Sequence, residues 1–314
     1  MLISRACCAG SSAKFSMILK LRVGAVSLRL EMLQVARLAP KLLGESCDLV
    51  VDFVQGQRNG DGGFTDRSGK SDLYYTVFGT LQADLSPGVT EQYLRGFGNG
   101  EFLDFVHLTC LARCWASLRK GILDQDTCRE ILHRIEGFRS QDGGYQDVPH
   151  SPHGTAYGCF LAMGAYQDLQ ADLPDIGGLT RCLKCLQTQD GAFANHPHLD
   201  AGTTPATAAA VTLLRCLGES VHPSVGRWLL SRCSPQGGFF AIPAAPIPDL
   251  LSTATALHAL AGMQVPLDDV KEPCLDFIDS LWTNKGAFYG NWMEDTLDCE
   301  YTYYALLGLG HLSL

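Results

Sequence analysis

The sequence has few charged residues, no long apolar run and no regularly spaced cysteine pairs. Of its 314 residues only 18% are charged, the net charge is -9 and the pI is about 5.4. This charge balance works against a broad phosphate-binding surface, so we expect no nucleic-acid partner. No stretch approaches the roughly 18 consecutive apolar residues of a transmembrane helix. With 46% hydrophobic residues, the chain can nevertheless form a sizeable core, which indicates a globular protein.

The 13 cysteines are scattered and form no paired CxxC motifs of the kind that frame a zinc knuckle. Pairs such as Cys110 and Cys114 have the spacing of one helix face. A disulfide scaffold is not expected in a chain of this length. We therefore predict reduced, mostly buried thiols and a cytoplasmic protein.

The first thirty residues contain five basic residues and no acid, since the first carboxylate is Glu31. This bias is typical of a transit or signal segment, but the apolar stretch is interrupted. A plain amphipathic helix or an overextended start is the preferred interpretation, with Met17 or Met32 as alternative starts.

What the sequence does have is an internal repeat, the feature that decides the fold when it is present. A threonine followed three positions later by a small residue opens an apolar helix at six places: Thr76/Gly79, Thr109/Ala112, Thr155/Gly158, Thr207/Ala210, Thr253/Ala256 and Thr302/Ala305. The units recur every 46 to 52 residues, apart from a shorter unit around Thr109.

A turn with two small residues and an aromatic residue precedes each full unit, at 59–64, 140–145, 188–193, 235–239 and 284–288. Glycine permits the backbone angles of a tight turn, and the aromatic side chain packs the turn onto its neighbour. The aspartates of these turns, Asp61, Asp142 and Asp190, are interpreted as structural, because nothing there resembles a phosphate-binding loop.

A second helical pattern lies between each threonine helix and the next turn, for example SVGRWLLSRC before Ser234. Each unit is therefore a pair of helices, and a pair cannot bury both apolar faces alone, so neighbouring units must stack. The threonine helices are apolar nearly all round and should form an inner layer, with the amphipathic helices outside. We expect the small residues, three positions after each threonine, to lie where neighbouring helices approach closely.

With these turns and threonine helices, the sequence resembles the protein prenyltransferase β subunits and the class II terpene cyclases, from about Leu49 to the C-terminus. The resemblance implies an all-α fold, an α/α toroid in which helix-pair repeats form an α6/α6-barrel-like ring. Residues 1–48 are then an N-terminal extension with leading helices, and residues 49–314 the toroid domain. It also implies a funnel-shaped apolar cavity, of the several hundred cubic ångströms usual for ligands, that accepts an isoprenoid diphosphate or another polyprenyl lipid.

In prenyltransferases an Asp-x-Cys pair at a helix start and a His on the next helix hold a catalytic zinc ion. When the family is aligned with this chain on the repeated threonine, these positions correspond to Asp298, Glu300 and Tyr75. Two carboxylates and a phenol suit zinc less well than Cys and His do. The resemblance also implies a possible α-subunit-like partner, while the basic residues that hold the diphosphate are replaced by Asn291, Trp292 and Asp295.

In terpene cyclases the same place carries the DxDDT acid motif, which corresponds here to residues 298–302, with Glu300 at the proton-donating position. Protonation of an alkene needs a dehydrated carboxyl group that stays neutral. The alternative is that Asp298 and Glu300 only begin a helix, where acids complement the helix dipole. The leading hypothesis is a prenyltransferase β-subunit-like protein, and the second is a terpene cyclase that uses Glu300 or Asp298 as its acid. A non-catalytic toroid that binds a lipid or a partner is the third hypothesis.

Several other side chains are candidates for substrate contact. Tyr75, Tyr301 and Tyr303 have helical spacing, which core packing explains as well as a cavity wall does. His153 lies in HGTAYG, which resembles the histidine-glycine element beside the diphosphate in the family. Closure of the ring predicts that Tyr75 and Asp298 lie within roughly 10 Å of each other.

Overall fold

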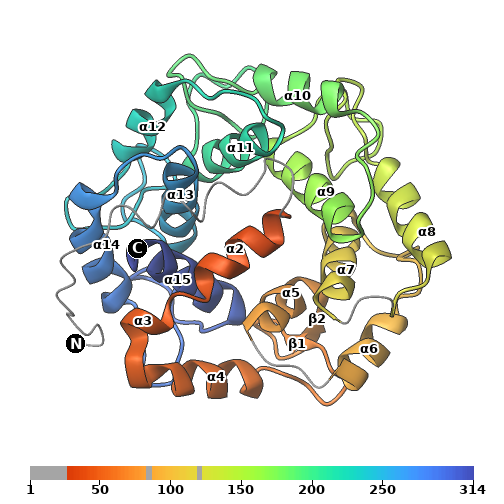
Figure 1. Ribbon diagram of the computed structural model, residues 1–314, viewed down its shortest axis with the longest axis horizontal. Coiled ribbons are helices and arrows are strands. Elements are labelled where there is room, and N and C mark those ends of the chain that lie inside the picture. The colour runs from red at the N-terminus through yellow and green to blue at the C-terminus, as the bar shows by residue number, and fades with distance from the viewer. Residues whose placement is uncertain (1–26, 83–86, 119–121) are drawn as a thin grey trace.

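The computed structural model describes residues 27–82, 87–118 and 122–314, so the expectations about the first 26 residues lie outside the described part. The chain forms a closed ring of helices, the α/α toroid that the repeats predict (Figure 1). The inner layer consists of α5 (Leu73–Gln82), α7 (Phe105–Ser117), α9 (Ala156–Asp168), α11 (Thr204–Cys216), α13 (Leu250–Gly262) and α15 (Cys299–Leu312). Each inner helix contacts the next, and α15 returns to α5, which closes the ring.

The outer layer surrounds this ring with the amphipathic helices. It consists of α4 (Cys47–Gly56), α6 (Pro87–Arg95), α8 (Gln125–Glu136), α10 (Ile176–Cys185), α12 (Pro223–Leu230) and α14 (Asp268–Ser280). Each outer helix packs on the inner helix of its own unit or of the next one (Figure 1). None of the described helices is long and apolar enough to cross a membrane. The described cysteines form no disulfide, and several of them are buried.

The glycine turns join the outer helix of each unit to its inner helix. One glycine in every turn has a φ between 84° and 96°, in the left-handed region that glycine favours: Gly62, Gly143, Gly191, Gly237 and Gly286. The first turn continues into a short hairpin of β1 (Phe64–Thr65) and β2 (Ser71–Asp72). The Asp142 carboxylate accepts hydrogen bonds from the backbone N–H groups of Gly144 and Gly154, at 3.1 Å each. The turn aspartates are thus structural, as the sequence indicates.

The repeated threonine connects each inner helix to its turn. The Thr76 hydroxyl accepts a hydrogen bond from the Phe64 N–H at 2.9 Å, and the Thr207 hydroxyl does the same for Phe193 at 3.0 Å. In the third unit the residue equivalent to Thr76 and Thr207 is Cys159. The threonine of that unit, Thr155, is instead the N-cap of α9, and its hydroxyl accepts a hydrogen bond from the Gly158 N–H. The threonine pattern is therefore displaced by one helical turn in that unit.

At the two glycines of this pattern, the small residue makes room for the turn and not for the neighbouring inner helix, which corrects the sequence-based expectation for these two positions. A Cβ atom on Gly79 would come within 2.2 Å of the Phe64 ring. A Cβ atom on Gly158 would come within 2.3 Å of the Tyr145 carbonyl oxygen. In these two units the close approach is thus between the inner helix and the aromatic turn of its own unit.

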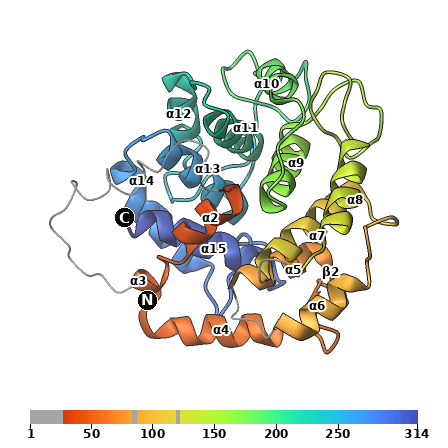
Figure 2. The same cartoon turned by 45° about the vertical axis from the view of Figure 1, so that its right-hand side comes forward.

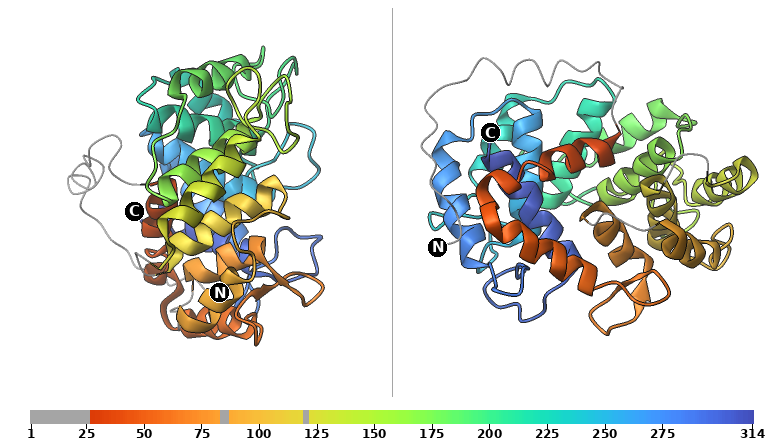
Figure 3. Two further views of the ribbon diagram at one scale, coloured as in Figure 1. Left: turned by 90° about the vertical axis from the view of Figure 1, so that its right-hand side faces the viewer. Right: turned by 60° about the horizontal axis from the view of Figure 1, so that its bottom comes forward.

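Helix α2 (Leu28–Ala36) crosses the central opening of the ring, as Figures 1 and 2 show. It lies at the carboxyl ends of the inner helices, since its Leu28 N–H donates to the Gln167 side chain and Arg29 donates to the Ala116 carbonyl. The chain then passes through α3 (Pro40–Leu43) and the 3-10 helix η1 (Gly44–Ser46) into α4. In side view, α2 lies at one face of the ring (Figure 3, left). A segment assigned to the extension from sequence thus closes one end of the toroid.

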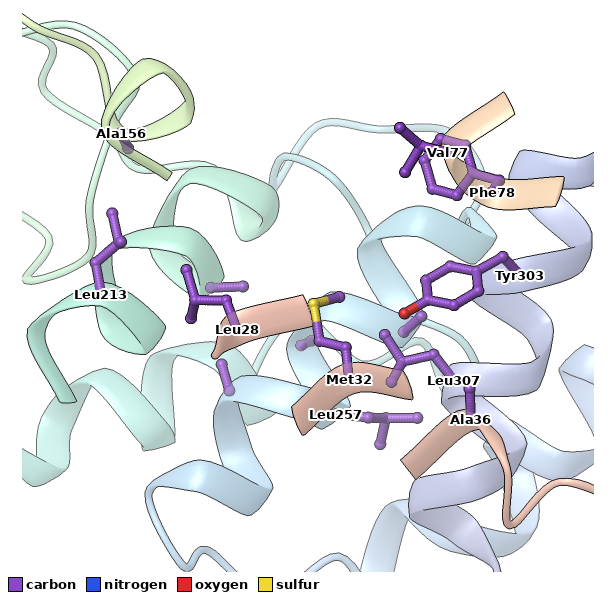
Figure 4. Close-up of a cluster of buried hydrophobic side chains, with 14 of the residues drawn as sticks. Leu28, Met32, Ala36, Val77, Phe78, Ala156, Leu213, Leu257, Tyr303 and Leu307 are labelled. Carbon is purple, nitrogen blue, oxygen red and sulfur yellow. The ribbon is translucent and has the colours of Figure 1, made fainter. Parts of the chain in front are cut away.

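The centre of the ring is filled mainly by apolar side chains from α2 and the inner helices. Figure 4 shows Leu28 and Met32 of α2 among Leu213, Leu257 and Tyr303. Leu28, Leu213 and Leu257 are completely buried. Burial of this many apolar side chains is the main stabilising contribution to the ring.

Candidate functional site

Asp298 begins helix α15 and is almost completely buried. One carboxylate oxygen accepts a hydrogen bond from the Tyr301 N–H at 2.8 Å, which satisfies a free amide of the first helical turn. The other oxygen lies 3.0 Å from the Arg67 guanidinium. Burial raises the pKa of Asp298, although both of these partners oppose that shift. Capping is therefore a real role of this residue, and Asp72 and Asp249 occupy equivalent positions in other units.

Glu300 lies in the first turn of α15, beside the side chains of α5. Its Oε1 accepts a hydrogen bond from the Tyr74 hydroxyl at 2.5 Å. Burial raises the pKa of Glu300 to about 7, against the hydrogen bond from Tyr74, and the charge of Asp298 adds to the increase. A carboxyl group with this pKa is partly protonated at neutral pH and is able to donate a proton.

Arg67, which the sequence analysis did not single out, joins the first repeat to the last. It contacts Glu294 at 3.3 Å in addition to Asp298, and its guanidinium lies 5.3 Å from the centre of the Tyr301 ring. The residue lies in the loop before β2, where no repeat pattern marks it. Only its position across the ring closure shows its role.

The ring closure brings most of the predicted site residues together. Burial, and then the charge of Asp298, raises the pKa of Tyr75 to about 12, as expected for neighbours across the junction. Tyr301 packs against Gly290, where a Cβ atom would come within 2.4 Å of the phenol ring. Tyr303 points into the centre of the ring, near Met32 (Figure 4). His153 is different: it lies on the loop before α9, where its Nδ1 is 3.5 Å from Asp142. Of all the predicted site residues, only Tyr303 lines the central cavity.

A second polar cluster lies at the amino ends of α5 and α7. The His107 ring lies between Asp72, at 3.0 Å from Nε2, and Asp104, at 2.9 Å from Nδ1. The hydrogen bond to Asp72 raises the pKa of His107 to about 9, so the ring is charged at neutral pH. This cation is balanced by two carboxylates and connects two helix starts.

The central cavity lies between four inner helices and α2. It is lined by Arg29, Met32, Tyr74, Val77, Phe78, Leu81, Thr109, Cys110, Arg113, Tyr157, Phe160, Leu161, Tyr303 and Tyr304. Tyr157 is 43% exposed at the start of α9, so the rim of the cavity is at the amino ends of the inner helices. Arg29 and Met32 belong to α2 and close the opposite end.

The cavity volume is about 70 Å³. Pockets for small organic ligands usually measure about 300–1,000 Å³, so this cavity is much smaller than the sequence led us to expect. The reason is α2, whose Leu28 and Met32 occupy the lumen (Figure 4). An open lumen is predicted by the repeats, but the helix that fills it precedes them.

Asp298 and Glu300 do not fit a zinc site. A guanidinium already occupies one oxygen of Asp298, and a phenol donates to Glu300. Among the described residues no group of three or more His, Cys, Asp or Glu side chains is arranged to hold a metal ion. A positive charge at 3.0 Å from a ligand oxygen opposes the binding of a cation there.

Comparison with known families gives one match. The model of the prenyltransferase alpha-alpha toroid domain matches residues 89–241 and 227–312. A search of curated proteins found no match.

Solved structures with the same fold include the type II terpene cyclase MstE from Scytonema in its apo form. The two chains are 18% identical, with a TM-score of 0.59, over 90% of this chain and 98% of that chain. A MstE variant in complex with geranylgeranyl dihydroxybenzoate matches at 15% identity and a TM-score of 0.57, over 90% and 97% of the chains. The protein geranylgeranyltransferase-I of Candida albicans, complexed with GGPP, matches at 14% identity and a TM-score of 0.48, over 95% and 85%.

Proposed function

The chain belongs to the prenyltransferase alpha-alpha toroid domain family, and on this basis we propose that it binds a polyprenyl lipid in its lumen and that Glu300 protonates an alkene of that lipid. The observation that carries the proposal is the Glu300 carboxyl group, with its pKa raised to about 7 and its hydrogen bond from Tyr74. Titration near the working pH is the property that an acid catalyst requires.

The surroundings of Glu300 suit a cationic intermediate. Tyr74, Tyr157 and Tyr304 line the cavity, and burial followed by the charge of Glu300 raises the pKa of Tyr304 well above its ordinary value. These phenols therefore stay neutral, and their ring faces attract positive charge. Glu300 does not itself line the cavity, but its hydrogen bond from Tyr74 places it directly behind this aromatic wall.

The reaction balances without a metal or a redox partner. The Glu300 proton adds to one carbon of the terminal double bond, and the other carbon becomes cationic. The electron pair of the next double bond forms a ring and carries the positive charge onward. Loss of a proton to the Glu300 carboxylate or to water ends the sequence, so the product is an isomer of the substrate.

Transfer of a prenyl group is the other activity that the family resemblance implies. That chemistry needs a zinc ion, which Asp298 and Glu300 do not fit. The structures of MstE in the comparisons are of a terpene cyclase, which agrees with the proposal at the level of the fold. An α-subunit-like partner stays a prediction.

A polyprenyl chain needs more space than 70 Å³, so its entry requires movement of the side chains around the cavity. Met32 and Arg29 line one end of the cavity and belong to a helix that is separate from the ring repeats. A shift of α2 enlarges the lumen without breaking any contact between inner helices.

The test is incubation of the purified protein with squalene or a geranylgeranyl lipid in the presence of a chelator. We expect a cyclic isomer of unchanged mass, and at least about a hundredfold loss of rate in Glu300→Gln. Glu219→Gln is the matched control, because Glu219 forms only an exposed ion pair with Lys184. Equal rates in both variants would refute the role of Glu300, and the absence of any turnover would leave lipid binding alone.

A further inference from the structure

Two arginines and one aspartate form the closed end of the cavity. Arg29 of α2 and Arg113 of α7 line the cavity, and the Asp168 carboxylate of α9 lies between them. The Arg29 Nε is 2.9 Å from one Asp168 oxygen and the Arg113 Nε is 3.2 Å from the other. The exposed fractions of these side chains are 11% for Arg29, 16% for Arg113 and 0% for Asp168.

The charges of this cluster do not balance. Two guanidinium groups, which stay protonated in proteins, share a single carboxylate. Within the described residues, the Arg113 Nη1 and Nη2 atoms donate no hydrogen bond, and the same is true of the Arg29 Nη1 atom. An unmatched charge in an apolar cavity is costly unless a ligand of opposite charge compensates it.

A glycine, Gly164, leaves space for the Arg113 guanidinium. A Cβ atom on Gly164, in the middle of α9, would come within 2.6 Å of the Arg113 Nη2 atom. Glycine inside a helix costs about 1 kcal/mol relative to alanine, so the gap has an energetic cost of its own. Arg113 pairs with Asp168 only through its Nε atom, and Asp168 in turn pairs with Arg29 of α2. Holding α2 in place therefore explains neither the free Nη groups of Arg113 nor the gap that Gly164 leaves beside them.

We propose that this end of the cavity binds the carboxylate of a prenylated carboxylic acid, with Arg113 as its main partner. The planar guanidinium donates two parallel hydrogen bonds, which match a carboxylate. A single negative charge balances the cluster, whereas a diphosphate would bring more charge than the one unmatched cation neutralises. The prenyl tail then extends past Phe78 and Phe160 toward Tyr74 and Tyr157 at the rim.

This inference rests on the proposed function and adds to it. A guanidinium without a counter-charge would raise the energy of a carbocation anywhere in the lumen, because like charges repel strongly at low dielectric constant. A bound carboxylate removes that penalty. The site therefore selects a substrate that carries its own negative charge at one end.

The test compares two lipids that differ only in the head group, geranylgeranoic acid and geranylgeraniol, by calorimetric titration of the full-length protein. We expect the acid to bind about tenfold more tightly or better. Arg113→Gln should abolish this preference, and Arg113→Lys should retain part of it. Lys184→Gln, which removes an exposed cation, is the control and should behave as wild type.

A second variant keeps the test decisive if Arg113→Gln folds poorly. Asp168→Asn removes the carboxylate that competes with the ligand, so the acid should bind this variant more tightly than wild type. Equal affinity for the acid and the alcohol in wild type, or an unchanged preference in Arg113→Gln, would overturn the proposal.

Failure of the proposed function is recognised separately. The five-carbon acid 3-methylbut-2-enoate carries the head group without a long tail, and its effect on the unfolding temperature is measured against that of the matching alcohol. If neither long lipid binds but the short acid stabilises wild type and not Arg113→Gln, the anion site stands and lumenal lipid binding fails. If the short acid has no specific effect either, the anion site is refuted.

Discussion

The Arg67 guanidinium lies 3.0 Å from the Asp298 carboxylate, although 231 positions separate the two residues in the chain. This contact joins the hairpin of the first unit to the start of the last inner helix. It also fixes the carboxylate that caps α15, next to the candidate acid Glu300. The closure of the ring and the candidate site are therefore one structural feature.

Replacement of Arg67 should weaken the ring closure. In Arg67→Gln the buried Asp298 keeps its backbone partner but loses its counter-charge, so we expect a loss of about 1–3 kcal/mol in the free energy of unfolding at pH 7. The loss should be smaller at pH 4, where protonation of Asp298 removes the need for a counter-charge. Arg129→Gln, at an exposed ion pair with Asp126, should cost less than about 1 kcal/mol. Urea unfolding measures both, and equal losses would contradict the prediction.

Glu300 should make stability depend on pH in a defined window. Its pKa in the folded state, about 7, lies above the ordinary value of 4.5, so the folded state binds the proton more tightly than the unfolded state. Wild type should therefore lose stability as the pH rises from about 4.5 to 7, by up to roughly 3 kcal/mol. Glu300→Gln should lack this loss. Unfolding curves at several pH values test it, and parallel pH profiles for the two proteins would show that the carboxyl titrates normally.

Gly158 should not tolerate a side chain. Alanine there places Cβ about 2.3 Å from the Tyr145 carbonyl oxygen, so we expect Gly158→Ala to cost about 1–3 kcal/mol and Gly158→Leu to cost more. Gly56→Ala is the control, because Gly56 is exposed at the end of α4 and no atom lies within 4 Å of the added Cβ. That change should be neutral or slightly stabilising. Thermal unfolding of the two variants separates overpacking from a general effect of adding a methyl group.

Met32 should limit the room in the lumen. Met32→Ala removes a nearly buried side chain that lines the cavity, so we expect a loss of about 2 kcal/mol or more in stability. The larger lumen should bind geranylgeraniol more tightly than wild type does. Leu30→Ala, on the exposed side of the same helix, should change neither quantity by much. If geranylgeraniol binds to Met32→Ala no more tightly than to wild type, α2 does not restrict entry of the lipid.

Much of the fold follows from short-range patterns in the sequence. The glycine turns, the threonines that bind them and the aspartates that begin the helices act over fewer than about fifteen residues, so their spacing alone predicts helix pairs. Pairs with two apolar faces must stack, and six of them close into a ring. Asp298 and Glu300 are recognised in the same way, as two acids at the start of a helix that is otherwise apolar.

The rest depended on contacts between residues far apart in the chain. The inner helices are apolar nearly all round, so their sequences do not show which side chains face the lumen or what fills it. Only the tertiary structure places α2 across the opening, Arg67 against Asp298, and Arg113 against Asp168. These positions are decided by packing and charge across the closed ring, where the separation along the chain leaves no periodic signal.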